Sequence, residues 1–305
     1  MQDARMRVND AHAHLFSRRW FEAFFERSPR FTPDDPLDEM AAILGFELPD
    51  ADPVALADRW VGEMDRHGVA RMVLLMSHPS DLDSVRQAVA AHPDRFIGYA
   101  MVNPTEDSAR DTVHDAFDLA AMGGLCLFPA LHHFRVDDPA AYPVYEEAAA
   151  FERPVFVHTG QLRIPVFAKL AIPDPVDLSF SDPGQLRTVA GDFADVTFVL
   201  PHFGCGRFDE ALELARECPN VVFDTSSSNG WIEPPDTLED VYRRALDVVG
   251  PERILFGTDS SAFPRGWRHD IYELQLGVIE RLGLGDDECN AILRGNLDRI
   301  CPPRS

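Results

Sequence analysis

Short runs of apolar and β-branched residues recur along the chain, and helix-like stretches separate them. Runs of this length, bounded by turn residues, are typical of buried strands. Eight such runs predict strands, at 6–12, 71–77, 95–104, 124–130, 154–160, 196–204, 221–228 and 253–261. The fifth run, PVFVHTG, is apolar up to His158. A lone histidine there is more often a satisfied core residue than a ligand, so its meaning depends on how the other strands end.

The stretches between the predicted strands have helical periodicity. The stretch 52–69 opens with an aspartate N-cap and a proline at the first helical position, and Gly68 ends it. Trp60 and Met64 belong to its apolar stripe. Alternating strands and helices predict parallel pairing with right-handed crossovers, and eight repeats predict an α/β fold, the (β/α)8 TIM barrel. An open doubly wound sheet is the alternative, but no GxGxxG motif follows the first strand.

Two segments are too long to be simple connections. Residues 15–51 form an insertion after the first strand, in which Phe16, Trp20 and Phe24 recur every four residues. This spacing predicts a small accessory core, with a direct substrate-binding face as the alternative. Residues 160–183 follow the fifth strand, and their aliphatic content predicts a lid-like loop packed over the barrel mouth. We expect residues 1–305 to form a single domain that includes both segments.

Charge and cysteine content narrow the class of protein. Lysine and arginine total 28 and aspartate and glutamate 51, which gives a net charge of −23. A surface with this excess of negative charge repels phosphate backbones and anionic lipids. We therefore expect neither nucleic acid nor a membrane as a partner. Five cysteines without a CxxC pair argue against a disulfide framework or a structural zinc cluster. With no apolar leader segment or long apolar window, a cytoplasmic location is the expectation.

Histidines and a carboxylate end several of the predicted strands. His12 and His14 end the first strand two residues apart, so their side chains project to the same face. His158, His202 and Asp259 end the fifth, sixth and eighth strands. Active sites of (β/α)8 barrels lie at these carboxyl ends. Imidazole and carboxylate groups suit one divalent ion; we expect Zn²⁺, and Mn²⁺ or Fe²⁺ would fit the same donors.

With these strand-end residues the chain resembles the amidohydrolase superfamily. The resemblance rests on five motifs that occur in the family's order along nearly the whole chain: VNDAHAHLF, ERPVFVHTG, TFVLPHFGCG, ERILFGTDSS and ILRGNLDRIC. It is closest to the amidohydrolase-related branch, the metal-dependent TIM-barrel enzymes like aminocarboxymuconate-semialdehyde decarboxylase. The resemblance is specific for the family and leaves the reaction open.

The resemblance implies a set of roles for these residues. One divalent metal would be held by His12, His14, His158 and Asp259, and His202 would stand beside the metal-bound water. Family members with two metals usually bridge them through a carboxylated lysine on the fourth strand. That strand reads GLCLFPA here, and the chain's one lysine, Lys169, lies after the fifth strand. The resemblance therefore implies a mononuclear site.

The chemistry of the ion leaves three functions open. The first prediction is hydrolysis of a small-molecule amide, ester or lactone by metal-activated water, with His202 and Asp259 as the catalytic groups. The second is decarboxylation of an aromatic or muconate-type acid on the same metal. The third is a metal-binding scaffold without turnover, against which the complete ligand set and the candidate base both argue. Asp10 is either a hydrogen-bond partner of a ligand imidazole or a structural group in the barrel.

Substrate contacts must come from the loops. Arg163 and Arg207 follow strands five and six and suit a bidentate carboxylate clamp, with surface ion pairs as the alternative. Trp267, past strand eight, is the third predicted substrate-binding residue. The aromatic stripe of residues 16–25 would suit a homodimer interface.

Overall fold

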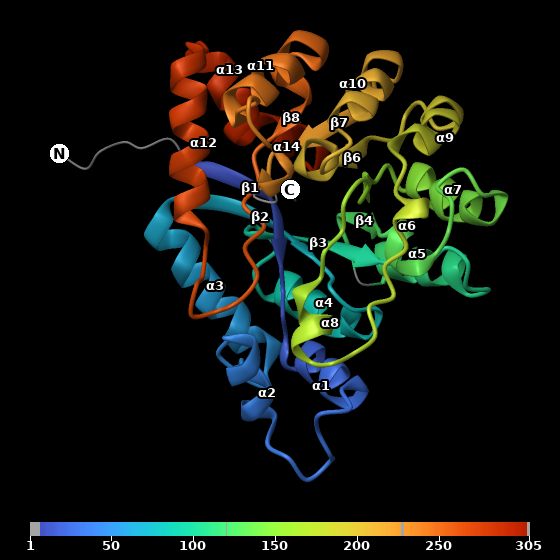
Figure 1. The fold of residues 1–305 in the computed structure, drawn as a ribbon, viewed down its shortest axis with the longest axis vertical. Helices are drawn as coiled ribbons and strands as arrows, with labels where there is room; N and C mark the ends of the chain where they lie inside the picture. Colours follow the sequence, from blue (N-terminus) through green and yellow to red (C-terminus); the bar gives the residue numbers. More distant parts are fainter. Residues whose placement is uncertain (1–6, 120, 227–228, 304–305) are drawn as a thin grey trace.

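Eight parallel strands in sequential order form the centre of the molecule (Figure 1). The computed structural model describes residues 7–119, 121–226 and 229–303. The strands are β1 (Val8–His14), β2 (Val69–Leu75), β3 (Phe96–Met101), β4 (Gly124–Leu127), β5 (Val155–Val157), β6 (Phe198–Leu200), β7 (Val221–Asp224) and β8 (Ile254–Leu255). Each lies within or overlaps a predicted strand; residues 6 and 227–228 of those predictions lie outside the described residues.

Hydrogen bonds between β1 and the segment that follows β8 bring the sheet round into a barrel. The Ala11 N–H donates to the Phe256 carbonyl over 2.8 Å, and the His14 N–H donates to the Ser260 carbonyl over 2.7 Å. A third bond, 2.8 Å long, joins the Asp259 N–H to the His12 carbonyl. The predicted (β/α)8 TIM barrel is confirmed, and its seam sets the ends of β1 and β8 side by side.

Helices surround the barrel and follow the strands in turn. They are α1 (Arg18–Arg27), α2 (Leu37–Leu44), α3 (Pro53–His67), α4 (Leu82–Ala91), α5 (Ala109–Asp118), α6 (Pro129–His132), α7 (Tyr142–Ala150), α8 (Pro165–Lys169), α9 (Leu186–Asp192), α10 (Phe208–Glu217), α11 (Leu238–Val249), α12 (His269–Leu282), α13 (Asp286–Asn290) and α14 (Asn296–Ile300). The predicted ends of α3 are correct: Asp52 caps it, and Gly68 follows in the left-handed conformation that glycine tolerates best.

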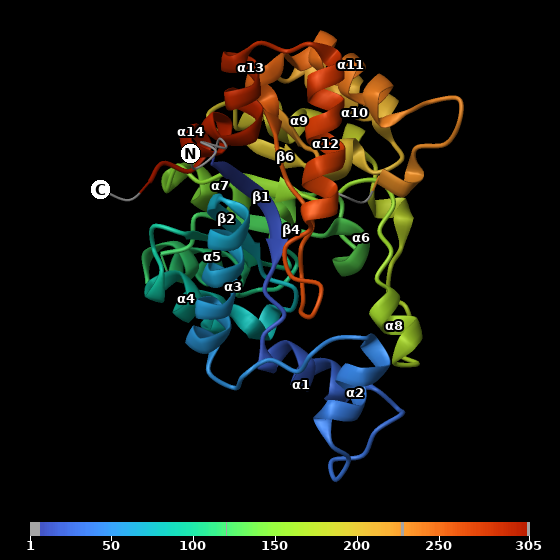
Figure 2. The same cartoon turned by 90° about the vertical axis from the view of Figure 1, so that its left-hand side faces the viewer.

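The two long segments pack together into one unit, which we call the cap and define as residues 15–51 and 160–183. Helices α1 and α2 project from the barrel, and α8 lies against them (Figure 2). Trp20, Phe24 and Phe167 share its hydrophobic core, which is separate from that of the barrel. The accessory core expected from the sequence is thus present, and it includes part of the loop after β5.

Polar bonds also join the two parts of the cap. The Ser28 hydroxyl donates to the Leu170 carbonyl over 2.7 Å, and the Lys169 ammonium donates to the Leu44 carbonyl over 2.8 Å. Most of the aromatic stripe that suggested a homodimer is buried within the chain, so the homodimer stays a prediction without that support. Among the helices of the described part of the chain, none combines the length and apolarity needed to cross a bilayer.

Candidate metal centre

His12 and His14 occupy the end of β1, where the sequence placed them. Their side chains point to the same side of the strand, and His12 is buried while His14 is partly exposed to the cavity. The two Nε2 atoms are 3.3 Å apart. The Ser77 hydroxyl lies 2.8 Å from His14 Nδ1, so this contact orients the His14 ring with Nε2 toward its neighbour.

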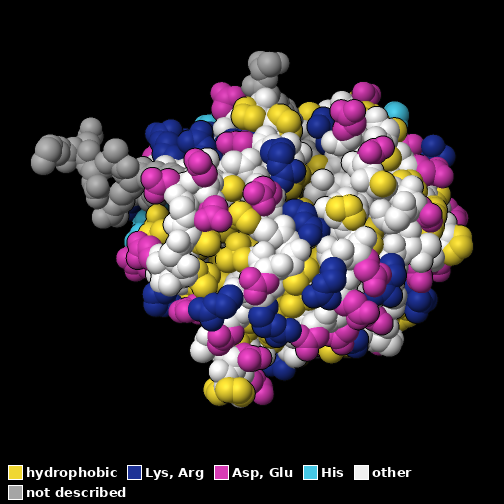
Figure 3. Space-filling view, turned by 90° about the horizontal axis from the view of Figure 1, so that it is seen from above, with side chains coloured by type: hydrophobic (Ala, Val, Ile, Leu, Met, Phe, Trp, Pro, Cys, Tyr) yellow, Lys and Arg dark blue, Asp and Glu magenta, His cyan; other side chains and the backbone are white. Residues whose placement is uncertain are grey.

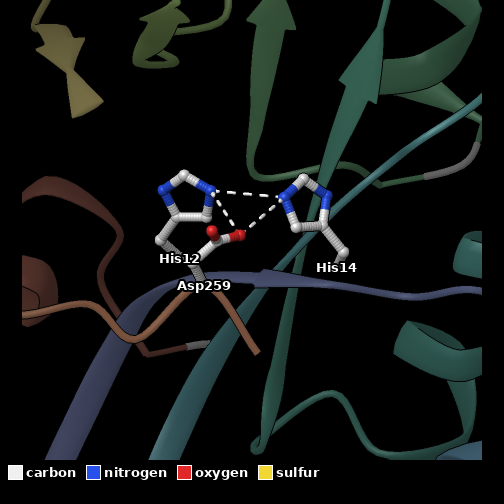
Figure 4. A group of neighbouring side chains, drawn as sticks. All are labelled: His12, His14 and Asp259. Carbon is white, nitrogen blue, oxygen red and sulfur yellow. Dashed lines mark hydrogen bonds and ion pairs between the residues drawn. The ribbon is translucent and has the colours of Figure 1, made fainter. Parts of the chain in front are cut away.

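Asp259 completes a triangle of donor atoms with these histidines (Figure 4). Its Oδ1 lies 3.2 Å from His14 Nε2 and 3.7 Å from His12 Nε2. Donors at about 2.1 Å from a tetrahedral ion are about 3.4 Å from one another, so the triangle has the dimensions of one face of such a site. The three side chains therefore fit a divalent ion, and they form the only such group among residues 7–119, 121–226 and 229–303.

Asp224, at the end of β7, holds the ring of His12. Its Oδ2 lies 2.6 Å from His12 Nδ1, and both side chains are buried. A carboxylate on Nδ1 fixes the tautomer and leaves Nε2 free to bind an ion. Asp224 was not predicted from the sequence, although a carboxylate that ends a barrel strand is the same signal that pointed to Asp259.

Neighbouring charges determine which side chains of the metal group and its surroundings are ionised. Burial works to raise the pKa of Asp259, but the hydrogen bond from His14 and the charge of His12 outweigh it and hold that pKa below its ordinary value. Burial likewise works to lower the pKa of His12, and the neighbouring Asp224 carboxylate reverses the effect. The pKa of Asp224 lies below its usual range because the charge of His12 outweighs burial. The carboxylates are therefore ionised, as metal ligands must be.

His158 and His202 lie beside the triangle, on the wall of the same cavity. Their ring centroids are 5.3 Å apart, and the His202 ring is 4.9 Å from that of His12. His158 Nδ1 is buried and has no hydrogen-bond partner within the described part of the chain. Burial and the charge of His202 hold the pKa of His158 well below its ordinary value, so its imidazole is neutral. A neutral imidazole with an unpartnered nitrogen suits a fourth ligand, which stays a prediction.

Comparison with known proteins identifies the family. The Amidohydrolase family profile matches residues 9–299. This chain belongs to the amidohydrolase family. Its members are metal-dependent enzymes, and the three-donor group described above is where the motifs of the family converge. The prediction that the chain is a metal-dependent enzyme is therefore confirmed, while the identity of the ion stays a prediction.

Two curated relatives resemble the amidohydrolase in sequence. It is 25% identical over 245 residues to 2-keto-4-carboxy-3-hexenedioate hydratase from Sphingobium sp., covering 72% of this chain and 69% of the hydratase. It is 32% identical over 89 residues to Protein fluG from Emericella nidulans, covering 29% of this chain and 10% of fluG. The match therefore spans about one tenth of the fluG protein, and the remaining nine tenths have no counterpart in this alignment.

Solved structures share the fold at low identity. One is the 5-carboxyvanillate decarboxylase LigW from Sphingomonas paucimobilis, with a TM-score of 0.68, 17% identity and coverage of 98% of this chain and 100% of that one. Another is a probable 2-pyrone-4,6-dicarboxylic acid hydrolase from Acinetobacter baumannii, with a TM-score of 0.61, 16% identity and coverage of 97% and 99%. At this identity the likeness concerns the barrel and not the reaction.

The metal group of this amidohydrolase opens into a cavity of about 1030 Å³. Arg163 lines it, as predicted for a substrate-binding residue. Arg207 is absent from the lining and lies near Glu210 on the surface. Trp267 is also absent: it is buried, and its indole N–H donates to Asp10 over 2.8 Å. Two of the three predicted substrate-binding residues are therefore not placed to touch a ligand in this cavity.

Asp10 has a structural role in the barrel of this family member. It accepts hydrogen bonds from the backbone N–H groups of His12 and Thr258, over 3.0 and 3.1 Å, and from the Thr258 hydroxyl. Burial raises the pKa of Asp10 to about 6, although these bonds oppose the rise. Of the two interpretations of Asp10, the structure shows the second: it joins β1 to the segment after β8 and touches neither ligand imidazole.

The fourth strand offers no amine for a second metal. Cys126 is buried there, and its thiol lies 3.7 Å from the Met76 and Tyr99 carbonyls. Lys169 is committed to the cap by its bond to Leu44. Both facts agree with the expectation of a mononuclear site in this amidohydrolase.

Proposed function

We propose that this protein is a metal-dependent lyase that decarboxylates an unsaturated or aromatic carboxylic acid. This puts decarboxylation ahead of hydrolysis, which the sequence analysis ranked first. The observation that carries the proposal is the charge of the cavity wall. Four basic side chains line it, Arg27, Arg163, Lys169 and Arg265, in a chain whose net charge is −23. Three acidic side chains line it as well, and one of them, Asp259, belongs to the metal group.

Arg265 is the basic residue best placed to bind the acid. It follows β8, and its guanidinium donates to the Ser261 hydroxyl over 2.8 Å. Burial lowers the pKa of Arg265, and the charge of Asp259 opposes that shift, so the two groups are within electrostatic reach. No ion pair joins Arg265 to a carboxylate in the described residues, which leaves its remaining N–H donors for a substrate carboxylate.

The named substrates of the relatives are consistent with an acid. The hydratase acts on a keto-carboxy-hexenedioate, and the two structural neighbours are named for a carboxyvanillate and a pyrone dicarboxylic acid. Each name contains a carboxylate. The names specify different reactions, so they support a carboxylic acid as the substrate more strongly than they support decarboxylation as the reaction.

The chain's own residues would divide the work as follows. A divalent ion held by His12, His14 and Asp259 would act as a Lewis acid that polarises the substrate. Decarboxylation breaks the bond to the carboxyl carbon, releases CO₂ and places one proton on the carbon left behind. We assign the delivery of that proton to His202, which would take it up from water at Nε2 and pass it to the carbon. Its Nδ1 lies 3.3 Å from the Ser226 carbonyl and 2.8 Å from the Ser226 hydroxyl, so Nδ1–H donates and Nε2 can exchange a proton.

The test is an assay of the purified, metal-containing protein on aromatic and unsaturated acids, with CO₂ release as the readout. Substitution His202→Asn should retain the metal and lose at least 100-fold in kcat. Substitution Arg265→Gln should raise KM at least tenfold. Arg207→Gln is the matched control, because Arg207 lies near Glu210 on the surface and does not line the cavity.

Other outcomes would redirect the assignment. Turnover of lactones or esters without CO₂ release would restore hydrolysis, the first prediction from the sequence. Addition of water to an unsaturated acid would keep the lyase class and the acid, and replace decarboxylation by hydration. Full activity in metal-free protein would contradict the whole proposal.

A further inference from the structure

A row of aromatic rings leads from the metal group into the cap. Phe16 follows β1, and its ring centroid lies 5.9 Å from that of His14. Phe16 stacks on Trp20 at 4.1 Å with the planes 5° apart, and Trp20 lies 4.6 Å from Phe24. Phe24 in turn lies 5.8 Å from Phe167 of α8. The row therefore continues from the insertion across to the loop after β5.

This aromatic row is a wall of the cavity as well as part of the cap core. Phe16, Trp20, Phe24 and Phe167 all line the cavity, and further apolar side chains of the cap and α6 join them there: Leu44, Phe46, Leu131, Ile164 and Val166. At about 1030 Å³ the cavity is slightly larger than the pockets of about 300–1,000 Å³ that hold drug-sized ligands. An acid with a single ring, held at the metal group and Arg265, would fill only its inner part.

The outer end of the row is polar. The Arg27 guanidinium carbon lies 5.9 Å from the centroid of Phe24 and 5.7 Å from that of Phe167. Arg27 is exposed and also lines the cavity. The apolar wall is thus bounded by the metal group at one end and by a solvated cation at the other, which limits how far an apolar ligand group could extend.

We propose that the substrate is a carboxylic acid with an extended apolar group, such as a second ring or an alkyl chain, which lies along the aromatic row. The inference rests on the proposed acid substrate, and it adds the part of the substrate that the cap recognises. The cap is then the specificity-determining unit, and the barrel supplies the chemistry. Aromatic side chains suit this role, because they contribute a large apolar area at fixed geometry.

The test measures binding of 4-alkylbenzoates of increasing chain length to the metal-containing protein by calorimetry. Each methylene that leaves water on the apolar wall should raise the affinity roughly fourfold until the chain reaches Arg27. Equal affinities for benzoate and 4-pentylbenzoate would overturn the inference and leave the proposed acid chemistry untouched.

Two variants connect the effect to the cap. Phe46→Ala removes a half-buried part of the wall, and Leu131→Trp fills cavity space from α6. We expect each to reduce the gain per methylene at least twofold while benzoate itself binds as before. Ile43→Ala is the matched control, because Ile43 lies on α2 with 42% of its surface exposed and does not line the cavity. Unchanged gains in both cavity variants, with folding verified by thermal melting, would also overturn the inference.

A neutral ligand series separates this inference from the proposed function. We expect 4-alkylbenzamides to bind at least tenfold more weakly than the acids and to show the same gain per methylene. If the amides bound as tightly as the acids and kept that gain, the aromatic row would stand and the acid substrate would be wrong.

Discussion

Asp224 is the residue whose loss should affect the metal most without removing a ligand. It touches His12 Nδ1 on the side away from the other donors. Substitution Asp224→Asn keeps the shape and weakens the bond that orients the ring, so we expect metal affinity to fall roughly 10- to 100-fold. Metal titration of the stripped protein measures the change.

A surface carboxylate gives the control for that comparison. Asp209 has 79% of its side chain exposed and pairs with Arg244. Asp209→Asn should bind metal as the unaltered protein does. If Asp224→Asn also kept full affinity, the role assigned to the Asp224–His12 bond would be wrong.

A second buried carboxylate makes stability depend on pH. Burial raises the pKa of Asp81 from 3.8 to about 6, although hydrogen bonds from Ser17 and Ser84 oppose the rise. The folded chain therefore holds this proton to a higher pH than the unfolded chain does, so the group lowers stability as pH rises from about 4 to about 6. Asp81→Asn removes the penalty and should stabilise the fold by up to about 3 kcal/mol at pH 7.

Urea denaturation at two pH values checks this sign. The variant should gain stability at pH 7 and match the unaltered protein at pH 4. Asp83→Asn, an exposed neighbour paired with Arg86, should not show this pattern. A gain of the same size at both pH values would show that ionisation of Asp81 is not its cause.

Individual residues also show what the sequence could and could not predict. His12, His14 and Asp259 were found because residues at strand ends of a barrel share one region, which is a property of topology. The role of Asp224 was not predicted, because it depends on the contact with His12, 212 positions away in the sequence. Trp267 is held in the interior by its bond to the Asp10 carboxylate, 257 positions away in the sequence, and no local pattern predicts that contact.

At the scale of elements, Arg253 joins the ends of two helices. Its guanidinium donates to the Ala215 and Cys218 carbonyls at the end of α10, over 2.9 and 3.2 Å. It also donates to the Val248 and Val249 carbonyls at the end of α11, over 3.3 and 3.2 Å. The Ala215, Val248 and Val249 carbonyls lie in the last turns of their helices, where the intrahelical donors run out. The Cys218 carbonyl also accepts from the Val221 N–H over 3.1 Å. Arg253 therefore supplies donors to the last carbonyls of both helices.

Substitution Arg253→Lys should therefore be costly despite the conserved charge. An ammonium cannot spread its donors over carbonyls from two helices as a planar guanidinium does. We expect a loss of about 2–4 kcal/mol in the free energy of unfolding, measured in urea. Arg243→Lys, an exposed position on α11 paired with Glu239, is the control and should change little. Equal stability of both variants would contradict the capping role.

The helices and strands were more predictable from the sequence than the contacts between them. Apolar runs and caps are local, so all eight strands and α3 were found from the sequence. The assembly of the cap was only half predicted. The sequence indicated a core within residues 15–51 and a loop over the barrel mouth, but the bond between Lys169 and Leu44 spans 125 positions. Pairing over such a distance is decided by the parallel order of β1 to β5, which places both segments at the same end of the barrel.

At the scale of the whole molecule, the sign of the charge differs between outside and inside. Acidic and basic side chains are interspersed on the end of the molecule away from α1 and α2 (Figure 3). Acidic side chains outnumber basic ones over the whole chain, which gives the net charge of −23. In the cavity lining, four basic side chains stand against three acidic ones. The anionic substrate that we propose would thus be repelled at long range and bound only at short range. The interior, and not the overall field, would select it.

The closure of the barrel between β1 and β8 has a consequence for the order in which the chain acquires its parts. His12 and His14 are synthesised before Asp259, which joins them only after the eighth strand is made. The cap needs no more than the chain up to residue 183. During synthesis from the N-terminus, the specificity unit can therefore assemble on a growing chain that cannot yet hold a complete metal site. In a half-made chain, the unit that we propose to select the substrate would therefore precede the unit that we propose to transform it.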